Sequence, residues 1–268
     1  MPEKLRILLN GETPLEPFQY SNEVRSLVYR WLSYADAKLA TAFHDENQVK
    51  PFSIGPIHSD SEHPGRMWFD IFSLSDVIID VIMQGLIKSG MNVELAEHGF
   101  SIAGMERCYR ISYKDILAGC ADGPKLNEFH FEVQTPAAHH ARGMFRKSVV
   151  TPSERYFGSW LRRWQLFSGV GLPSSLSAIL HERMAVSFFS GTTQLVELNR
   201  KDSLHREEEN DNRKFIGFVG KVSFEVLKPG TLSKEELVSI AALARFSEYS
   251  GVGVETMRGM GRIRYMRE

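Results

Sequence analysis

The stretch GVGVETMRGMGRIRY at residues 251–265 holds the residue types best suited to chemistry in this chain. Glycines without side chains let backbone N–H groups approach a phosphate closely, and neighbouring arginines add positive charge. The pattern therefore indicates a loop that contacts phosphates. Its candidate residues are Gly251, Gly253, Arg258, Gly259, Gly261 and Arg262.

Two other interpretations of this loop need to be weighed. A dinucleotide-binding fingerprint requires a strand before the glycines and a helix after them. Here the expected order is the reverse, and only a few residues follow, so a nicotinamide or flavin cofactor is excluded. A simple turn, with glycines that end the preceding helix, stays open as the structural alternative.

A second basic segment lies at residues 142–164, where six basic residues face one acidic residue, Glu154. Trp160 and Trp164 are spaced as one face of a helix, which is typical of core residues. If the partner is RNA, we expect the basic side chains to contact its phosphates. They are Arg142, Arg146, Lys147, Arg155, Arg162 and Arg163.

The elements that must position these residues come in two similar series. In the first, alternation predicts strands at 4–10, 50–58 and 66–75, and helical periodicity covers 22–45. A second helix should begin at Ser75 or Asp76 and end at Gly90, before a β-rich segment at 92–113.

The second series predicts a strand at 128–135, a helix at 153–168 and strands at 183–198 and 214–228. A capping box of Ser233 and Glu236 opens the next helix, and a strand ends the chain. Both series follow a β-α-β-β-α-β order. We therefore predict an α+β protein of tandem ferredoxin-like (RRM-like) domains, 1–125 and 126–268.

A helix, a G-x-G…G-x-G loop and a final strand at the end of such a chain resemble the CRISPR-associated endoribonucleases of the RAMP superfamily. In the order of its elements, the resemblance covers the whole chain. In specific sequence, it covers the tail and AKLATAFHDE, residues 37–46. It implies an enzyme that cuts CRISPR repeat RNA (precursor crRNA) to produce guide RNAs. It also implies a metal-independent reaction, in which the RNA's 2′-hydroxyl attacks the phosphate and leaves a 2′,3′-cyclic phosphate and a 5′-hydroxyl.

The same resemblance singles out His44, which closes the family-like segment, and sets it in the first domain. Tyr29 and Lys50 stand at a spacing similar to a Tyr/His/Lys set of some family members. His44 would act as general base or acid, with Lys50 and Tyr29 in support. An ordinary histidine at a helix end is the structural alternative.

Geometry places a condition on this set. Tyr29 and His44 would be roughly 22 Å apart in one straight helix, too far to share a phosphate. The helix must therefore break between them, and Asp36 is a suitable N-cap for a short second helix at 37–44. Tyr20 or Tyr34 could replace Tyr29.

Two other functions compete with this hypothesis. A non-catalytic RNA-binding RAMP subunit of a guide-RNA complex would bind the same RNA without cutting it. An unrelated ferredoxin-like enzyme of small-molecule metabolism would not bind RNA. A homodimer and assembly into a guide-RNA effector complex are left open.

Composition and charge restrict the kinds of partner and cofactor that we expect for this chain. With 32 basic and 33 acidic residues the formal charge is −1, so any polyanion must be held by local patches. Cys108 and Cys120 form no C-x-x-C pair, and we expect two buried thiols and no metal or cofactor. Without a signal peptide or an apolar stretch long enough to span a bilayer, we expect a cytoplasmic protein.

Overall fold

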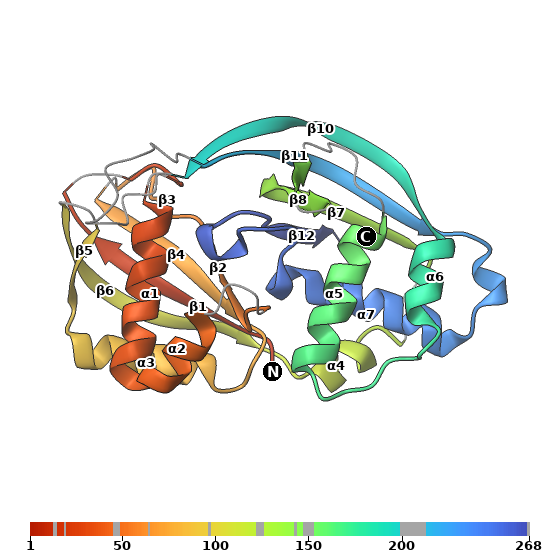
Figure 1. The fold of residues 1–268 in the computed structure, drawn as a ribbon, viewed down its shortest axis with the longest axis horizontal. Helices are drawn as coiled ribbons and strands as arrows, with labels where there is room; N and C mark the ends of the chain where they lie inside the picture. The colour runs from red at the N-terminus through yellow and green to blue at the C-terminus, as the bar shows by residue number, and fades with distance from the viewer. Residues whose placement is uncertain are drawn as a thin grey trace.

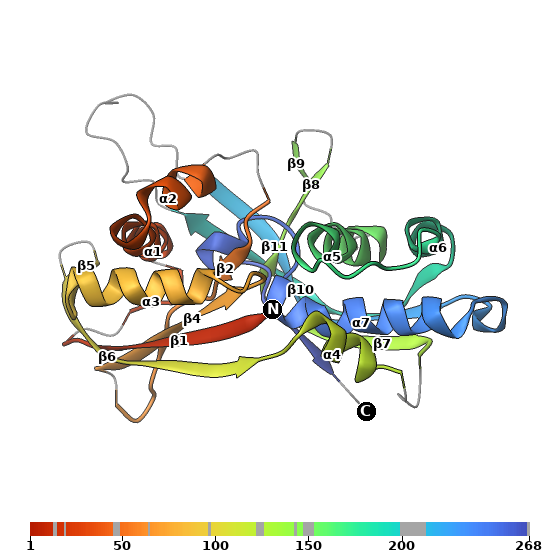
Figure 2. The same ribbon diagram turned by 90° about the horizontal axis from the view of Figure 1, so that it is seen from below.

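The protein is described here from a computed structural model. It describes residues 1–12, 15–18, 20–44, 49–63, 65–95, 98–121, 126–141, 144–146, 153–198 and 213–266. Two halves lie side by side, each a β-sheet with helices on one face (Figures 1 and 2). The long hairpin of the second half arches toward the first (Figure 1).

The first half follows the predicted order, with the predicted short second helix and two extra strands. Its elements are β1 (Glu3–Asn10), α1 (Ser21–Ala35), α2 (Ala37–His44), β2 (Phe52–Ile54), β3 (His58–Ser59), β4 (Arg66–Ser73), α3 (Ile78–Ser89), β5 (Asn92–Leu95) and β6 (His98–Arg110). The antiparallel sheet runs β2-β4-β1-β6-β5, and β3 also pairs with β4. The strands β2-β4-β1-β6 have the ferredoxin-like arrangement.

Alternation in β1 creates the core of this half. Leu5, Ile7 and Leu9 are at most 1% exposed and join the residues of α1 and α3 in one hydrophobic cluster. The ring of Trp31, on α1, stacks on Phe69, on β4, with centroids 6.4 Å apart. Burial of this apolar face holds α1 on the sheet.

The second half repeats the arrangement. Its elements are α4 (Tyr113–Ala118), β7 (Glu128–Ala137), β8 (His139–Ala141), β9 (Met144–Arg146), α5 (Ser153–Phe167), α6 (Leu176–Glu182), β10 (Met184–Leu198), β11 (Arg213–Val226), the 3₁₀ turn η1 (Pro229–Thr231), α7 (Lys234–Ser250), the 3₁₀ turn η2 (Thr256–Arg258) and β12 (Ile263–Met266). Its main sheet runs β10-β11-β7-β12, again the ferredoxin-like order. The tandem ferredoxin-like prediction is therefore confirmed.

Two local predictions for this half are confirmed. The predicted capping box is present: the Ser233 side chain accepts from the Glu236 N–H, and the Glu236 carboxylate accepts from the Ser233 N–H. Trp160 and Trp164 have 0% exposure, which confirms their expected place in the core. No helix in the described ranges is long and apolar enough to cross a membrane.

Helix α4 belongs to the second core, although it precedes the predicted domain boundary. The Tyr113 ring lies 4.8 Å from that of Trp164, edge to face, and its hydroxyl donates to the Leu74 carbonyl at 2.8 Å. Ile116 is fully buried in the same cluster. The boundary between residues 125 and 126 stays a prediction.

Two local expectations were wrong. Neither Ser75 nor Asp76 caps α3: the N-cap is Val77, the Ser75 N–H donates to the Ser73 hydroxyl, and Asp76 binds the amino terminus. Cys120 is buried, but Cys108 is exposed, at a β-bulge near the end of β6.

One arginine of the glycine-rich segment joins the two halves. Arg262 is 7% exposed, and its guanidinium carbon lies 3.3 Å from the centre of the Phe72 ring, on β4. The guanidinium also donates to the Glu248 carbonyl of α7 and to the Ser53 hydroxyl of β2, the latter at 3.4 Å. Burial lowers the pKa of Arg262 to about 10, so the buried group stays charged at neutral pH.

The four glycines of this segment all have positive φ angles, between 67° and 86°. A Cβ on Gly261 would lie 1.8 Å from the carbonyl oxygen of Val252, and one on Gly259 would lie 2.9 Å from the Pro56 nitrogen, in the first half. The absent side chains therefore allow backbone to pack on backbone, both within the loop and across the junction.

Replacing Gly261 by alanine should therefore destabilise the protein before any ligand is considered. We expect a loss of about 2–4 kcal/mol in the free energy of unfolding, since a left-handed residue gains a side chain against a carbonyl. Urea unfolding of Gly261→Ala measures it. Gly230→Ala is the control, because no atom lies within 4 Å of its added Cβ. Equal stability of the two variants would contradict this account.

Candidate active site

The predicted break between Tyr29 and His44 is present. α1 ends at Ala35, and Asp36 has extended backbone angles, φ −150° and ψ 96°. The Asp36 carboxylate accepts the Leu39 N–H at 3.0 Å and so caps the short helix α2. The chain therefore turns back on itself, and the end of α2 lies against α1.

The turn brings Tyr29 and His44 together. Their ring centroids are 5.8 Å apart with the planes at 70°, an edge-to-face contact. The Tyr29 hydroxyl donates to the carbonyl of Phe43 at 2.9 Å, and so holds the end of the helix that carries His44. His44 itself is exposed, so its imidazole is accessible to a substrate.

Two arginines add positive charge around Tyr29. The guanidinium of Arg25, one turn earlier on α1, lies 5.5 Å from the centre of the Tyr29 ring. Burial raises the pKa of Tyr29, and the charges of Arg25 and Arg258 oppose that rise. The phenol nevertheless stays protonated at neutral pH, because its pKa remains above the ordinary value.

Lys50 precedes β2, which lies next to the same cluster. The ring of Phe52, two residues later, lies 6.1 Å from that of Tyr29 and 5.9 Å from that of Phe43. The chain therefore enters the sheet beside Tyr29. Lys50 is half-buried there.

The glycine-rich segment reaches this cluster from the other half. Arg258 donates from Nε to the Asn22 side chain of α1 at 2.6 Å, and it also pairs with Glu255. A small pocket lies where this arginine meets α1 and β2; besides Arg258, it is lined by Pro17, Ser21, Val24, Ile54, Gly55, Pro56 and Ile57. The loop therefore adjoins the helix that carries Tyr29.

Part of the loop's hydrogen-bonding capacity is used within the protein. The Gly251 N–H donates to Ser247 O at 2.8 Å, and the Gly261 N–H donates to Pro136 O at 2.9 Å. These two amides do not point out as phosphate donors, and a packing role explains both glycines. A Cβ on Gly253 would likewise lie 2.2 Å from the Ala138 carbonyl oxygen. A phosphate-binding role for the loop stays a prediction.

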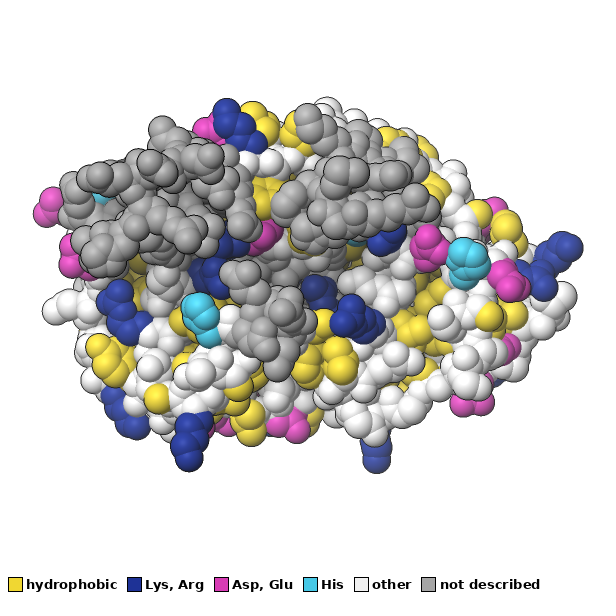
Figure 3. All heavy atoms as spheres, in the orientation of Figure 1, with side chains coloured by type: hydrophobic (Ala, Val, Ile, Leu, Met, Phe, Trp, Pro, Cys, Tyr) yellow, Lys and Arg dark blue, Asp and Glu magenta, His cyan; other side chains and the backbone are white. Residues whose placement is uncertain are grey.

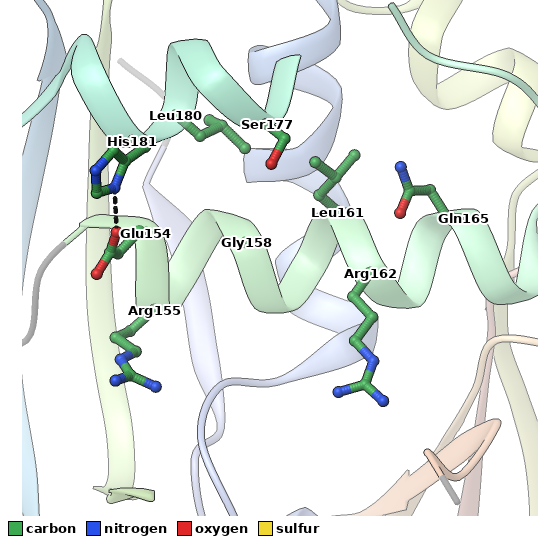
Figure 4. A pocket seen from close by; sticks show the side chains of 9 residues that line it. All are labelled: Glu154, Arg155, Gly158, Leu161, Arg162, Gln165, Ser177, Leu180 and His181. Carbon is green, nitrogen blue, oxygen red and sulfur yellow. Dashed lines mark hydrogen bonds and ion pairs between the residues drawn. The ribbon is translucent and has the colours of Figure 1, made fainter. Parts of the chain in front are cut away.

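The basic residues of α5 divide into two kinds. Arg155 and Arg162 are exposed, and their side chains extend from the same side of the helix (Figure 4). Arg163 instead turns inward and donates to the carbonyl of Ser250 at 2.7 Å, and burial lowers its pKa to about 10. Arg163 therefore anchors α5 to the end of α7.

The structure describes only one of the other three predicted RNA contacts in this basic segment. Arg142 and Lys147 lie outside the described residues, and Arg146 is part of β9. Exposed arginine and lysine side chains, together with a histidine, occur on the face that carries α1, α2 and α5 (Figure 3).

A groove between α5 and α6 contains a second histidine of interest. His181 Nδ1 lies 2.5 Å from a carboxylate oxygen of Glu154, and Ser177 lies on the same wall (Figure 4). His139 is different, because burial lowers its pKa to about 4 and its ring packs 5.5 Å from that of Tyr156. In the described ranges no three His, Cys, Asp or Glu side chains are grouped to hold a metal ion.

Sequence reasoning missed Arg25, although its i, i+4 spacing to Tyr29 was visible. It also gave no indication that Arg258 would bind Asn22, since the two are 236 residues apart in sequence.

Comparison with known proteins agrees with this architecture. The family model of the CRISPR-associated endoribonuclease Cas6 matches residues 131–263. Thermus thermophilus Cas6 has the same fold, with a TM-score of 0.69 at 20% identity over 99% of this chain and 98% of that one. A Cas6 solved as a product complex gives 0.76 at 22% identity over 99% of both chains. A Cas6-related protein from Pyrococcus furiosus gives 0.63 at 15% identity over the full length of both. None of the curated proteins compared matches the chain.

The family match covers residues 131–263, and the fold agrees over almost the whole chain. These findings confirm the resemblance to the CRISPR-associated endoribonucleases of the RAMP superfamily.

Proposed function

We propose that this chain is a metal-independent endoribonuclease that cuts CRISPR repeat RNA and so releases guide RNAs. The observation that carries the proposal is the contact between Tyr29 and His44, next to the segment that joins the two halves. Relatives of the same fold are described as a product complex and a substrate-mimic complex, which supports an RNA substrate for this chain.

In the proposed reaction the 2′-hydroxyl oxygen attacks the neighbouring phosphorus and loses its proton. The bond from phosphorus to the 5′-oxygen breaks, and that oxygen takes up a proton. The products are a 2′,3′-cyclic phosphate and a 5′-hydroxyl. His44 serves as general base or general acid, because a histidine can gain or lose a proton near neutral pH.

The other residues of the set support this histidine. Tyr29 fixes the end of α2 through the Phe43 carbonyl, so the position of His44 depends on it. Lys50 provides a positive charge for the developing negative charge on the phosphoryl oxygens. Arg155 and Arg162, on the other half, hold the flanking RNA by its phosphates.

The mechanism is tested by the substrate and by metal removal. Cleavage of a host repeat RNA should continue in excess EDTA and stop when the nucleotide before the cut lacks its 2′-hydroxyl, since only RNA carries the attacking oxygen. Denaturing gels and end-group analysis measure this. The 2′-deoxy substrate should still bind, because phosphates dominate affinity.

The outcomes separate the alternatives. Binding without cleavage of the unmodified RNA would indicate a non-catalytic RNA-binding subunit. No affinity for RNA would indicate another class of enzyme. A requirement for Mg²⁺, or cutting of the 2′-deoxy substrate, would overturn the mechanism.

Replacing His44 by alanine should slow single-turnover cleavage by about 10²–10⁴, the usual contribution of one proton-transfer group. The dissociation constant for the 2′-deoxy RNA should change by no more than about threefold. His63→Ala is the matched control, since that exposed histidine lies outside the cluster. If His44→Ala cuts at the wild-type rate, the site is elsewhere.

Reversing the charge of both Arg155 and Arg162 should weaken binding and flatten its salt dependence. The log–log slope should fall by about 0.7–0.9 for each phosphate that the protein no longer neutralises. The double variant Lys114→Glu/Lys234→Glu changes the net charge equally at two other exposed lysines and should keep the slope. Equal slopes for the two double variants would place the RNA away from α5.

A further inference from the structure

Two guanidinium groups lie near Tyr29, but they differ in how they are partnered. Arg258 is already engaged by the Asn22 side chain and by the Glu255 carboxylate. Its side chain is only 16% exposed. It joins the two halves, and its low exposure and existing partners leave it less accessible to a ligand.

Arg25 is the opposite case. Within the described part of the chain no carboxylate lies within ion-pair distance of it, and its partner is Tyr29, whose ring it covers. The side chain is half-buried, so the positive charge is partly withdrawn from water without an acidic partner. Such a charge favours the arrival of an anion.

Its position matches the proposed reaction. Arg25 and Tyr29 are four residues apart on α1, and therefore lie on one side of the helix. The Tyr29 ring has the Arg25 guanidinium 5.5 Å from its centre and the His44 imidazole 5.8 Å from it. Both groups therefore flank one ring, Tyr29, where a phosphodiester bound between them would be within reach of each.

We propose that Arg25 binds the phosphate at the cleavage site and stabilises the charge that develops on its non-bridging oxygens. This inference rests on the proposed function and adds a residue to it. A guanidinium presents a planar fork of donors, which fits two phosphoryl oxygens at once. In the reaction Arg25 gives up no proton: the 2′-hydroxyl proton leaves through His44 or another base, and Arg25 stays a cation throughout.

The division of tasks follows from the contacts. Tyr29 positions His44 through the Phe43 carbonyl, and its ring also packs against the guanidinium of Arg25. Removal of Arg25 should therefore act on the charge of the transition state, whereas removal of the Tyr29 hydroxyl should act on the position of the histidine.

The test compares Arg25→Ala and Arg25→Lys with Arg30→Ala in single-turnover cleavage of repeat RNA. Arg30 is an exposed arginine on another side of the same helix. Arg25→Ala should cut about 10²–10³ times more slowly, as expected when one oxyanion donor is removed. Arg25→Lys should fall between, since an ammonium keeps the charge but loses the fork. Arg30→Ala should equal the wild type.

Replacing a phosphate oxygen by sulfur tests the contact between Arg25 and the phosphate directly. In the wild type, sulfur in place of one of the two non-bridging oxygens at the cut should slow the reaction in one stereoisomer more than in the other. Arg25→Ala should lose that discrimination. In a Tyr29→Phe background, Arg25→Ala should still cause a further loss, since the two side chains act on different atoms.

The outcomes are distinct. Wild-type rates in Arg25→Ala, or an unchanged sulfur effect with no further loss in the Tyr29→Phe background, would overturn the inference and leave the proposed function intact. If the wild type and Arg30→Ala both fail to cut repeat RNA, the proposed function fails, and the role of Arg25 fails with it. Arg25→Lys decides the question if the alanine variant does not fold.

Discussion

The buried guanidinium of Arg262 determines how the two ferredoxin-like halves sit against each other. Taking a charge out of water costs several kcal/mol, so the group is stable only where its surroundings compensate. Here compensation comes from the Phe72 ring, the Glu248 carbonyl and the Ser53 hydroxyl. These partners belong to β4, α7 and β2, and they can be met together only in one orientation of the halves.

The candidate active site is a consequence of that orientation. Four residues before Arg262, Arg258 holds the first turn of α1, and Gly259 packs on Pro56. The helix that carries Tyr29 is therefore anchored by the second half, although the residue itself belongs to the first. The ring pair of Tyr109 and Tyr249, 5.8 Å apart, adds an apolar contact at the same junction.

What the sequence could predict was local. The break at Asp36 and the capping box at Ser233 depend on neighbours within four residues, and both are confirmed. The inward turns of Arg262 and Arg163 depend on partners 209 and 87 residues away. Arginine is ordinarily exposed, so no periodicity indicated their burial. The glycines were correctly placed in a tight turn, but the carbonyls against which they pack could not be read from the sequence.

The arrangement of charge explains how a chain with a net charge of −1 can hold a polyanion. On the sheet of the first half, Lys4 and Arg6 both pair with Asp70, and Arg107 pairs with Glu3, at 2.7–2.9 Å. A cation that already has a carboxylate partner adds little attraction for a phosphate. Arg25 on α1 and Arg162 on α5 have no such partner among the described residues. Carboxylates thus neutralise these three cations of the sheet, whereas Arg25 and Arg162 on the helices keep their charge available, and that distribution, more than the total charge, favours the helical side as the RNA-binding face.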